Sequence, residues 1–194
     1  MAEQSIKLDG VKVLLGVSGG IAAYKAADLA SKLTQAGATV KTVMTESALQ
    51  MIGAKSFEAV TGQQVYTNLW ITSEEYEIGH ISLTDWADVA VVAPATANII
   101  GKMANGICDD LLSTVLCARW NKTLLFAPAM NDKMWTNPAV QKNVKMLIGI
   151  GVEIVGPQTG RLACGAEGIG RMAEPQDIIR AIGKIVAGLK NKGK

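Results

Sequence analysis

The sequence predicts a doubly wound α/β fold, Rossmann- or flavodoxin-like, with one parallel sheet and a single domain over residues 1–194. Two observations lead to this prediction. Apolar runs of strand length alternate along the chain with longer stretches that have the spacing of amphipathic helices. The apolar runs are also continuous rather than alternating, as expected for a parallel sheet whose two faces are both covered.

The alternation gives the order of the elements. Strands are expected at Val11–Val17, Val40–Met44, Val89–Ala93, Leu124–Ala127 and Val152–Val155. Helices are expected in stretches that include Ala22–Ala36, Asp109–Ala118, Pro138–Ile148 and Pro175–Leu189. No internal repeat, low-complexity tract or linker interrupts the pattern, so one domain is predicted.

Composition argues against several classes of protein. The net charge of +2, with Lys and Arg scattered along the chain, gives no electrostatic support for nucleic-acid binding. Three cysteines without a CxxC pair and a single histidine do not suit a metal site. The apolar runs fall short of the roughly 20 residues that span a bilayer, and the N-terminus lacks a signal-peptide core. We therefore expect a cytoplasmic protein without membrane or nucleic-acid partners.

Polar or glycine-rich turns follow each predicted strand. Ligands of doubly wound sheets bind beyond the carboxyl ends of the strands, where the strand order reverses. We therefore expect the five turns to gather at one edge of the sheet and to form one site. They are Ser18–Gly20, Thr45–Ser47, Pro94–Asn98, Pro128–Asn131 and Gly160–Gly170.

The first two turns suit a phosphate group. Gly19 and Gly20 let the backbone approach an anion at a helix N-terminus, and the Ser18 hydroxyl can donate to it. Thr45 and Ser47 add two hydroxyls at the start of the next helix. A ligand-free βα turn and an ordinary helix cap are the alternative interpretations of the two segments.

The third turn suits a flat ring. Ala95, Thr96 and Ala97 are small, and the Asn98 amide together with the backbone can hydrogen-bond a polar edge. A loop with a helix cap is again the alternative.

The fourth turn is the most specific segment, because no plain structural reason explains Pro, Met, Asn, Met and Trp within eight residues. Asn131 can bind a carboxylate through its amide without adding charge. His80 is the only side chain whose ordinary pKa lies near neutrality, so it is the first candidate for a base. The glycine-rich segment 160–172 suits a mobile flap that brings Cys164 to the site. Cys108 and Cys117 are interpreted as buried packing residues.

Together, these segments resemble the homo-oligomeric flavin-containing cysteine decarboxylases, from Val11 to about Ile185. The motifs that carry the resemblance are GVSGGIAAYK, the His80 segment, PATAN, PAMNDKMW and LACGAEGIGRMAEP. Many relatives have Thr after the asparagine of the third turn, where this chain has Ile99, and one hydroxyl contact to the flavin is thereby lost.

The resemblance implies FMN as the cofactor, held by the first three turns, and 4′-phosphopantothenoylcysteine as the substrate. Oxidation of the substrate to a thioaldehyde, loss of CO₂ and reduction of the enethiol would give 4′-phosphopantetheine for coenzyme A biosynthesis. His80 would be the base, Cys164 would protonate the enethiol, and Asn131, Met134 and Ala163 would bind the substrate.

The resemblance also implies a homotrimer or a dodecamer of trimers, with sites shared between subunits, and a phosphopantothenate–cysteine ligase as a partner. Three alternative functions stay open. A flavin prenyltransferase would leave His80 and Cys164 without a role. A peptidyl-cysteine decarboxylase of lantibiotic maturation would share the chemistry. A non-catalytic regulator of the halotolerance type would be expected to carry long acidic extensions.

Overall fold

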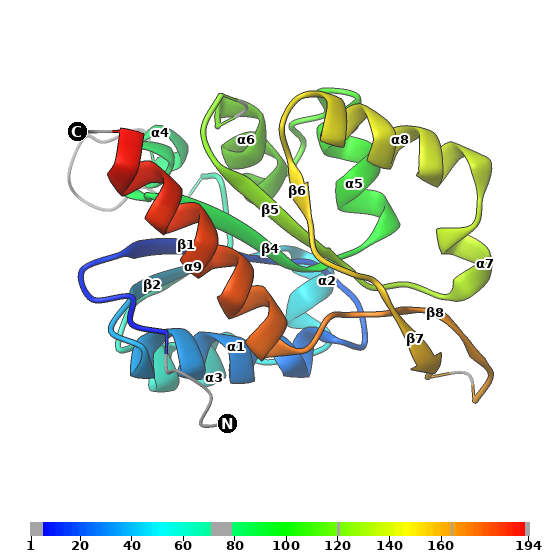
Figure 1. Cartoon of the computed structure of the whole chain (residues 1–194), viewed down its shortest axis with the longest axis horizontal. Helices are drawn as coiled ribbons and strands as arrows, with labels where there is room; N and C mark the ends of the chain where they lie inside the picture. Colours follow the sequence, from blue (N-terminus) through cyan, green and yellow to red (C-terminus); the bar gives the residue numbers. More distant parts are fainter. Residues whose placement is uncertain (1–5, 71–78, 120, 164, 193–194) are drawn as a thin grey trace.

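The computed structural model describes residues 6–70, 79–119, 121–163 and 165–192 (Figure 1). Its main sheet has six parallel strands in the order β3-β2-β1-β4-β5-β6, which confirms the predicted doubly wound fold. The strands are β1 (Lys12–Val17), β2 (Thr39–Met44), β3 (Val65–Tyr66), β4 (Val89–Ala95), β5 (Leu124–Pro128) and β6 (Glu153–Ile154). The five predicted strands are all present, whereas β3 was not predicted.

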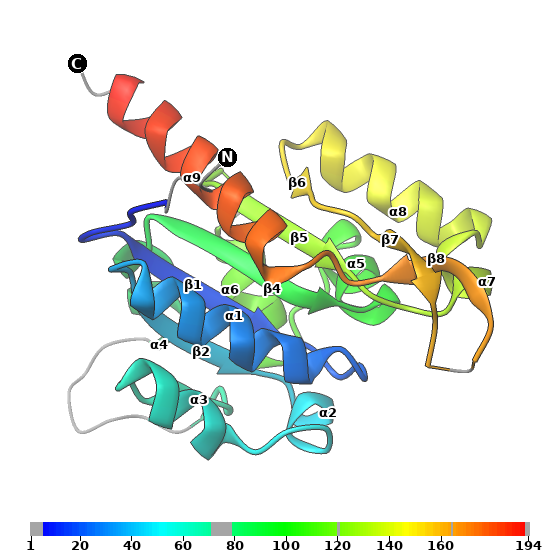
Figure 2. The same cartoon turned by 60° about the horizontal axis from the view of Figure 1, so that its bottom comes forward.

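Helices cover both faces of the sheet, as Figures 1 and 2 show. One face packs against α1 (Ala23–Gln35), α3 (Ala54–Thr61) and α9 (Pro175–Lys192). The opposite face packs against α4 (Gly79–Trp86), α5 (Ala97–Ala104), α6 (Leu111–Ala118) and α8 (Pro138–Gly149). Two single-turn helices, α2 (Glu46–Leu49) and α7 (Asp132–Trp135), follow β2 and β5.

The continuous apolar runs supply both cores at once. Along β1, Val13 and Leu15 enter the core under α1 and α9, while Leu14 between them enters the opposite core. All three side chains are at most 1% exposed. Because neighbouring side chains of a strand point to opposite faces, a strand buried on both faces must be apolar at every position.

The glycine-rich flap is an antiparallel hairpin of β7 (Gln158–Arg161) and β8 (Glu167–Arg171). It is seated on the turn after β5, since the Met130 N–H donates to the Gly170 carbonyl at 3.0 Å. A Cβ on Gly170 would lie 2.1 Å from the Met130 carbonyl oxygen, so only glycine permits this approach.

The interpretation of Cys108 as a buried packing residue is wrong. Cys108 is exposed and precedes α6, whose N-cap is Asp110, and Cys117 is half-buried. Desolvation, together with the neighbouring Cys117 thiol, raises the pKa of Cys108 to about 11. Few thiolates therefore form at neutral pH, so exposure alone does not make this cysteine a strong nucleophile.

Candidate active site

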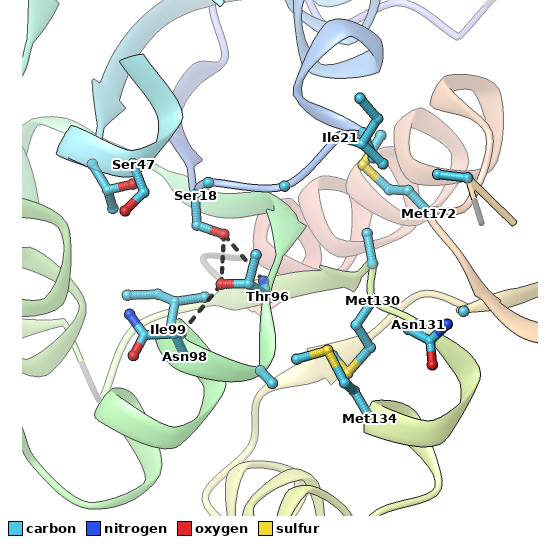
Figure 3. A pocket seen from close by; sticks show the side chains of 18 of the residues that line it. Ser18, Ile21, Ser47, Thr96, Asn98, Ile99, Met130, Asn131, Met134 and Met172 are labelled. Carbon is cyan, nitrogen blue, oxygen red and sulfur yellow. Dashed lines mark hydrogen bonds between the residues drawn. The ribbon is translucent and has the colours of Figure 1, made fainter. Parts of the chain in front are cut away.

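A cavity of about 1190 Å³ lies beyond the carboxyl ends of β1 and β4, the adjacent strands at which the sheet order reverses (Figure 3). Its walls include residues of all five predicted turns. Small-molecule sites typically measure roughly 300–1,000 Å³, so this cavity has room for a cofactor together with a substrate.

The Ser18 hydroxyl joins the first turn to the third. It donates to the Pro94 carbonyl at 2.7 Å and accepts from the Thr96 N–H at 3.1 Å. The Thr96 hydroxyl lies 3.1 Å away as a further partner. Ser18 is only 2% exposed, and its one hydroxyl hydrogen is directed to Pro94. The side chain predicted to donate to a phosphate therefore holds two turns of the cavity wall together in this structure.

The glycines of the first turn allow close packing against its neighbours. A Cβ on Gly19 would lie 2.3 Å from the Ser47 Cβ, and one on Gly20 would lie 3.3 Å from the Thr96 methyl carbon. Helix α1, which follows, has no side-chain cap and no acidic residue in its first turn. Because the first N–H groups of a helix lack intrahelical partners, this wall can bind an anion.

The second turn retains hydroxyl donors at the cavity. The Thr45 oxygen accepts from the Ala48 N–H at 3.2 Å and so caps α2, but its hydroxyl hydrogen can still be donated. Ser47 is exposed and also lines the cavity.

The third turn contributes Thr96, Ala97 and Asn98 to the cavity wall, with Asn98 exposed at the start of α5. Ala95 is fully buried behind this wall, and its carbonyl accepts from the Ala129 N–H at 3.0 Å. Ile99 is 1% exposed and packs in the core under α5 and α6. The isoleucine at this position therefore adds apolar packing where the threonine of many relatives would place a hydroxyl.

Asn131 and Met134 lie in the fourth turn, on the opposite side of the cavity from Ser47 (Figure 3). The Asn131 Oδ1 accepts from the Lys133 N–H at 3.0 Å and thereby caps α7. This bond makes the oxygen the acceptor end of the amide, so the NH₂ end is the donor. Met134 is 48% exposed and offers an apolar surface beside it.

Two predicted catalytic side chains cannot be placed. Cys164 lies outside the described residues, although Ala163, which precedes it, lines the cavity. His80 is the second residue of α4, but its side chain is outside the described part.

The far end of α4 is held by the buried Arg119, whose Nη1 donates to the carbonyls of Thr84 at 2.6 Å and Ala87 at 2.9 Å. Burial lowers the pKa of Arg119.

Charged side chains of the cavity wall were given no role from sequence. Lys25 and Arg171 both contact Glu174 Oε1, at 2.7 and 3.1 Å, which ties α1 to the base of the hairpin. Lys25 and Arg171 stand in the quoted motifs, but their shared partner could not be recognised because Glu174 lies 149 residues from Lys25.

A second charged group lies on the α5 side. Lys102 contacts Asp109 at 2.6 Å and Asp110 at 2.7 Å. Burial opposes the charge of Lys102, but the two carboxylates outweigh it and raise the pKa of the lysine. Lys102 lies four residues after Asn98 on α5, and this spacing could have indicated from the sequence that the two side chains share a face of the helix. Among the described residues, no group of three or more His, Cys, Asp or Glu side chains could hold a metal ion.

Comparison with known proteins identifies the family. A model of the family described as Flavoprotein matches residues 1–187. The chain belongs to the Flavoprotein family. Its relatives include the bifunctional protein CoaBC of coenzyme A biosynthesis from Bacillus subtilis, which is 49% identical over 173 residues. That match covers 89% of this chain and 42% of the relative, so the chain spans less than half of the length of such curated relatives.

Solved structures with the same fold are found among similar proteins. A cysteine-to-serine mutant of PPC decarboxylase complexed with pantothenoylaminoethenethiol superposes with a TM-score of 0.80 at 37% identity. It covers 89% of this chain and 96% of that one. The FMN-binding protein AtHal3 gives a TM-score of 0.77 at 37% identity, covering 89% and 94%. No helix within the described residues has both the length and the hydropathy to cross a membrane.

The contact that holds the hairpin against the fourth turn can be tested by Gly170→Ala. The added Cβ collides with the Met130 backbone, so β8 must move away from the fourth turn. We expect a loss of stability of about 1–3 kcal/mol, typical of overpacking, measured by denaturant unfolding. Gly149→Ala is the control, because a Cβ there meets nothing within 4 Å. Equal stability of the two variants would show that this contact does not hold the hairpin.

Proposed function

We propose that this member of the Flavoprotein family is an FMN-dependent decarboxylase that converts 4′-phosphopantothenoylcysteine to 4′-phosphopantetheine in coenzyme A biosynthesis. One observation carries the proposal: a single cavity joins the three turns suited to FMN with Asn131, Met134 and the hairpin that bears Ala163. The names of the B. subtilis relative and of the PPC decarboxylase structure support the same reaction.

The residues present fit FMN. Its phosphate would bind at the uncapped N-terminus of α1, where the hydroxyls of Thr45 and Ser47 can also donate to it. The ring would lie against Ala97, with Asn98 at its polar edge. When bound, the flavin supplies the two-electron chemistry, accepting electrons from the cysteinyl CH₂–SH and returning them after CO₂ has left.

The protein binds the substrate and moves protons. Asn131 holds the carboxylate by donating a hydrogen bond from its NH₂ group. Because this donor is neutral, it forms no ion pair that would stabilise the carboxylate against leaving as CO₂. His80 takes a proton during substrate oxidation, and Cys164 delivers one to the enethiol at the end. Met134 in the fourth turn and Ala163 in the hairpin line the cavity, and their side chains would contact the substrate.

The role of Cys164 gives a distinctive prediction. In Cys164→Ser the hydroxyl is a far weaker acid than the thiol, so CO₂ is released while the final protonation stalls. We expect an oxidised product two mass units lighter than 4′-phosphopantetheine, detected by mass spectrometry. Normal production of 4′-phosphopantetheine by this variant would remove Cys164 from the mechanism.

We also propose a homo-oligomer, at least a trimer, with sites shared between subunits. The exposed apolar side chains of Ile21, at 68%, and Tyr24, at 64%, stand three residues apart at the start of α1 and support it, since such groups mark contact surfaces when they cluster. Light scattering should give at least three times the mass of one chain, and the mass of one chain with flavin retained would refute the trimer.

An enzyme of this pathway would work in the cytoplasm beside a phosphopantothenate–cysteine ligase.

The proposed substrate is tested by comparing CO₂ release from two compounds. The purified protein should be yellow, with about one FMN per chain, and should release CO₂ from 4′-phosphopantothenoylcysteine but not from a peptide that ends in cysteine. Faster release from the peptide would instead favour the lantibiotic type of reaction. An absorbance spectrum without flavin bands, unchanged by added FMN, would refute the cofactor.

A further inference from the structure

Three cations gather where the hairpin meets the cavity. Lys25, Arg161 and Arg171 all line it. Lys25 and Arg171 are neighbours because both contact the same oxygen of Glu174. Arg171 also lies over the residue before Arg161, since its Nη1 is 2.7 Å from the position of a Cβ on Gly160. We call these three residues the flap cations.

The flap cations carry more charge than their contacts neutralise. Glu174 is the one carboxylate in contact with them within the described residues, so three positive charges face one negative charge. The Arg161 side chain, in that same part of the chain, makes no hydrogen bond or ion pair. Glu167 pairs with Arg161 in the hairpin ladder but does not line the cavity. The flap cations therefore carry a surplus of two positive charges.

The surplus matches one phosphomonoester, which carries about −1.5 to −2 charges at neutral pH. The wall suited to the FMN phosphate is formed by Ser47 and the first turn of α1, which includes Lys25, whereas Arg161 and Arg171 lie on the hairpin strands. A second phosphate therefore has its own binding region within the same cavity. A guanidinium is well suited to this group because its planar N–H donors match phosphate oxygens in pairs.

We infer that Arg161 binds the phosphate of the substrate and so determines the selectivity for a phosphorylated substrate, with Lys25 and Arg171 adding to the field. This inference rests on the proposed function. The phosphate and the carboxylate of the extended substrate are about 13 Å apart. Arg161 and Asn131 line the same cavity, whose volume of about 1190 Å³ accommodates a substrate of this length.

The test compares substrates with and without the phosphate, using the holoprotein. The ratio of kcat/KM for 4′-phosphopantothenoylcysteine to that for pantothenoylcysteine is measured in the wild type and in Arg161→Gln. We expect the ratio to fall about 10- to 100-fold, as for the loss of a charge-assisted hydrogen bond. Most of this fall should come from a lower kcat/KM for the phosphorylated substrate. Arg180→Gln is the control, since Arg180 pairs with Asp177 on α9 and does not line the cavity.

Calorimetric binding of 4′-phosphopantetheine and of pantetheine provides a readout without turnover, and the same loss of discrimination is expected there. An unchanged ratio in Arg161→Gln, with an active wild type, would overturn the inference and leave the proposed function intact. A fall in FMN content in this variant would also overturn it, because the flap cations would then serve the cofactor. A wild type that decarboxylates neither substrate would refute the proposed function instead.

Discussion

Asn131→Asp is expected to lower turnover by roughly 10³-fold. The new carboxylate would face the carboxylate of the substrate, and two like charges about 4 Å apart repel by about 4 kcal/mol at an effective dielectric constant of 20. The fold should remain intact, because aspartate caps a helix as well as asparagine does and the Lys133 N–H keeps an acceptor. CO₂ release in a single turnover measures the effect.

Asn137→Asp is a matched control for this substitution. Asn137 caps α8 through the Ala139 N–H, in the same way as Asn131 caps α7 through Lys133, but it does not line the cavity. The control adds the same charge six residues away and should keep full activity. Similar losses in both variants would mean that the charge acts through the fold, and normal turnover by Asn131→Asp would remove Asn131 from carboxylate binding.

Gly19→Ala is expected to weaken FMN binding by roughly 10²-fold or more and to give a colourless protein. The new Cβ would lie 2.3 Å from the Ser47 Cβ and 2.7 Å from the Ser47 carbonyl carbon, so the first two turns must separate. These turns form the wall suited to the phosphate, and contacts with charged groups are worth about 1.5–3 kcal/mol each. Fluorescence titration with FMN measures the change in affinity.

Gly188→Ala controls for the loss of a glycine, since a Cβ there meets nothing within 4 Å. Adding Ser47→Gly to Gly19→Ala removes the nearest clashing atom, but it also removes the Ser47 hydroxyl and leaves the backbone carbon in place, so only partial recovery of FMN binding is expected. Normal FMN affinity in Gly19→Ala would show that the two turns do not need this packing to hold the cofactor.

The sequence was sufficient for the fold where strands are buried on both faces. After the exposed Lys12, β1 is apolar because Val13, Leu15 and Val17 enter one core and Leu14 enters the other. The residues of β4 alternate between the two cores in the same way from Val89 to Ala93. Strand β3 was missed because it has only two residues, Val65 and the half-buried Tyr66, and so leaves no run to recognise. The gathering of the turns at one edge followed from the parallel topology alone.

The roles of individual side chains depended on partners far away in sequence. Ser18 was predicted to donate to a phosphate, but it bonds Pro94 and Thr96, more than 70 residues away. The glycines of the segment 160–172 suggested mobility. In the structure, Gly170 also permits close contact with the backbone of Met130, and the mobility stays a prediction. Neither pairing leaves a local pattern in the sequence.

We propose that the cavity binds FMN and a cysteine-derived carboxylate and removes that carboxylate as CO₂. The most direct test is incubation of the purified holoprotein with 4′-phosphopantothenoylcysteine carrying ¹³C in the cysteinyl carboxylate. We expect the label to appear as CO₂ in equal amount to unlabelled 4′-phosphopantetheine. A flavin-loaded protein that binds this substrate and leaves the label in the carboxylate would contradict the account.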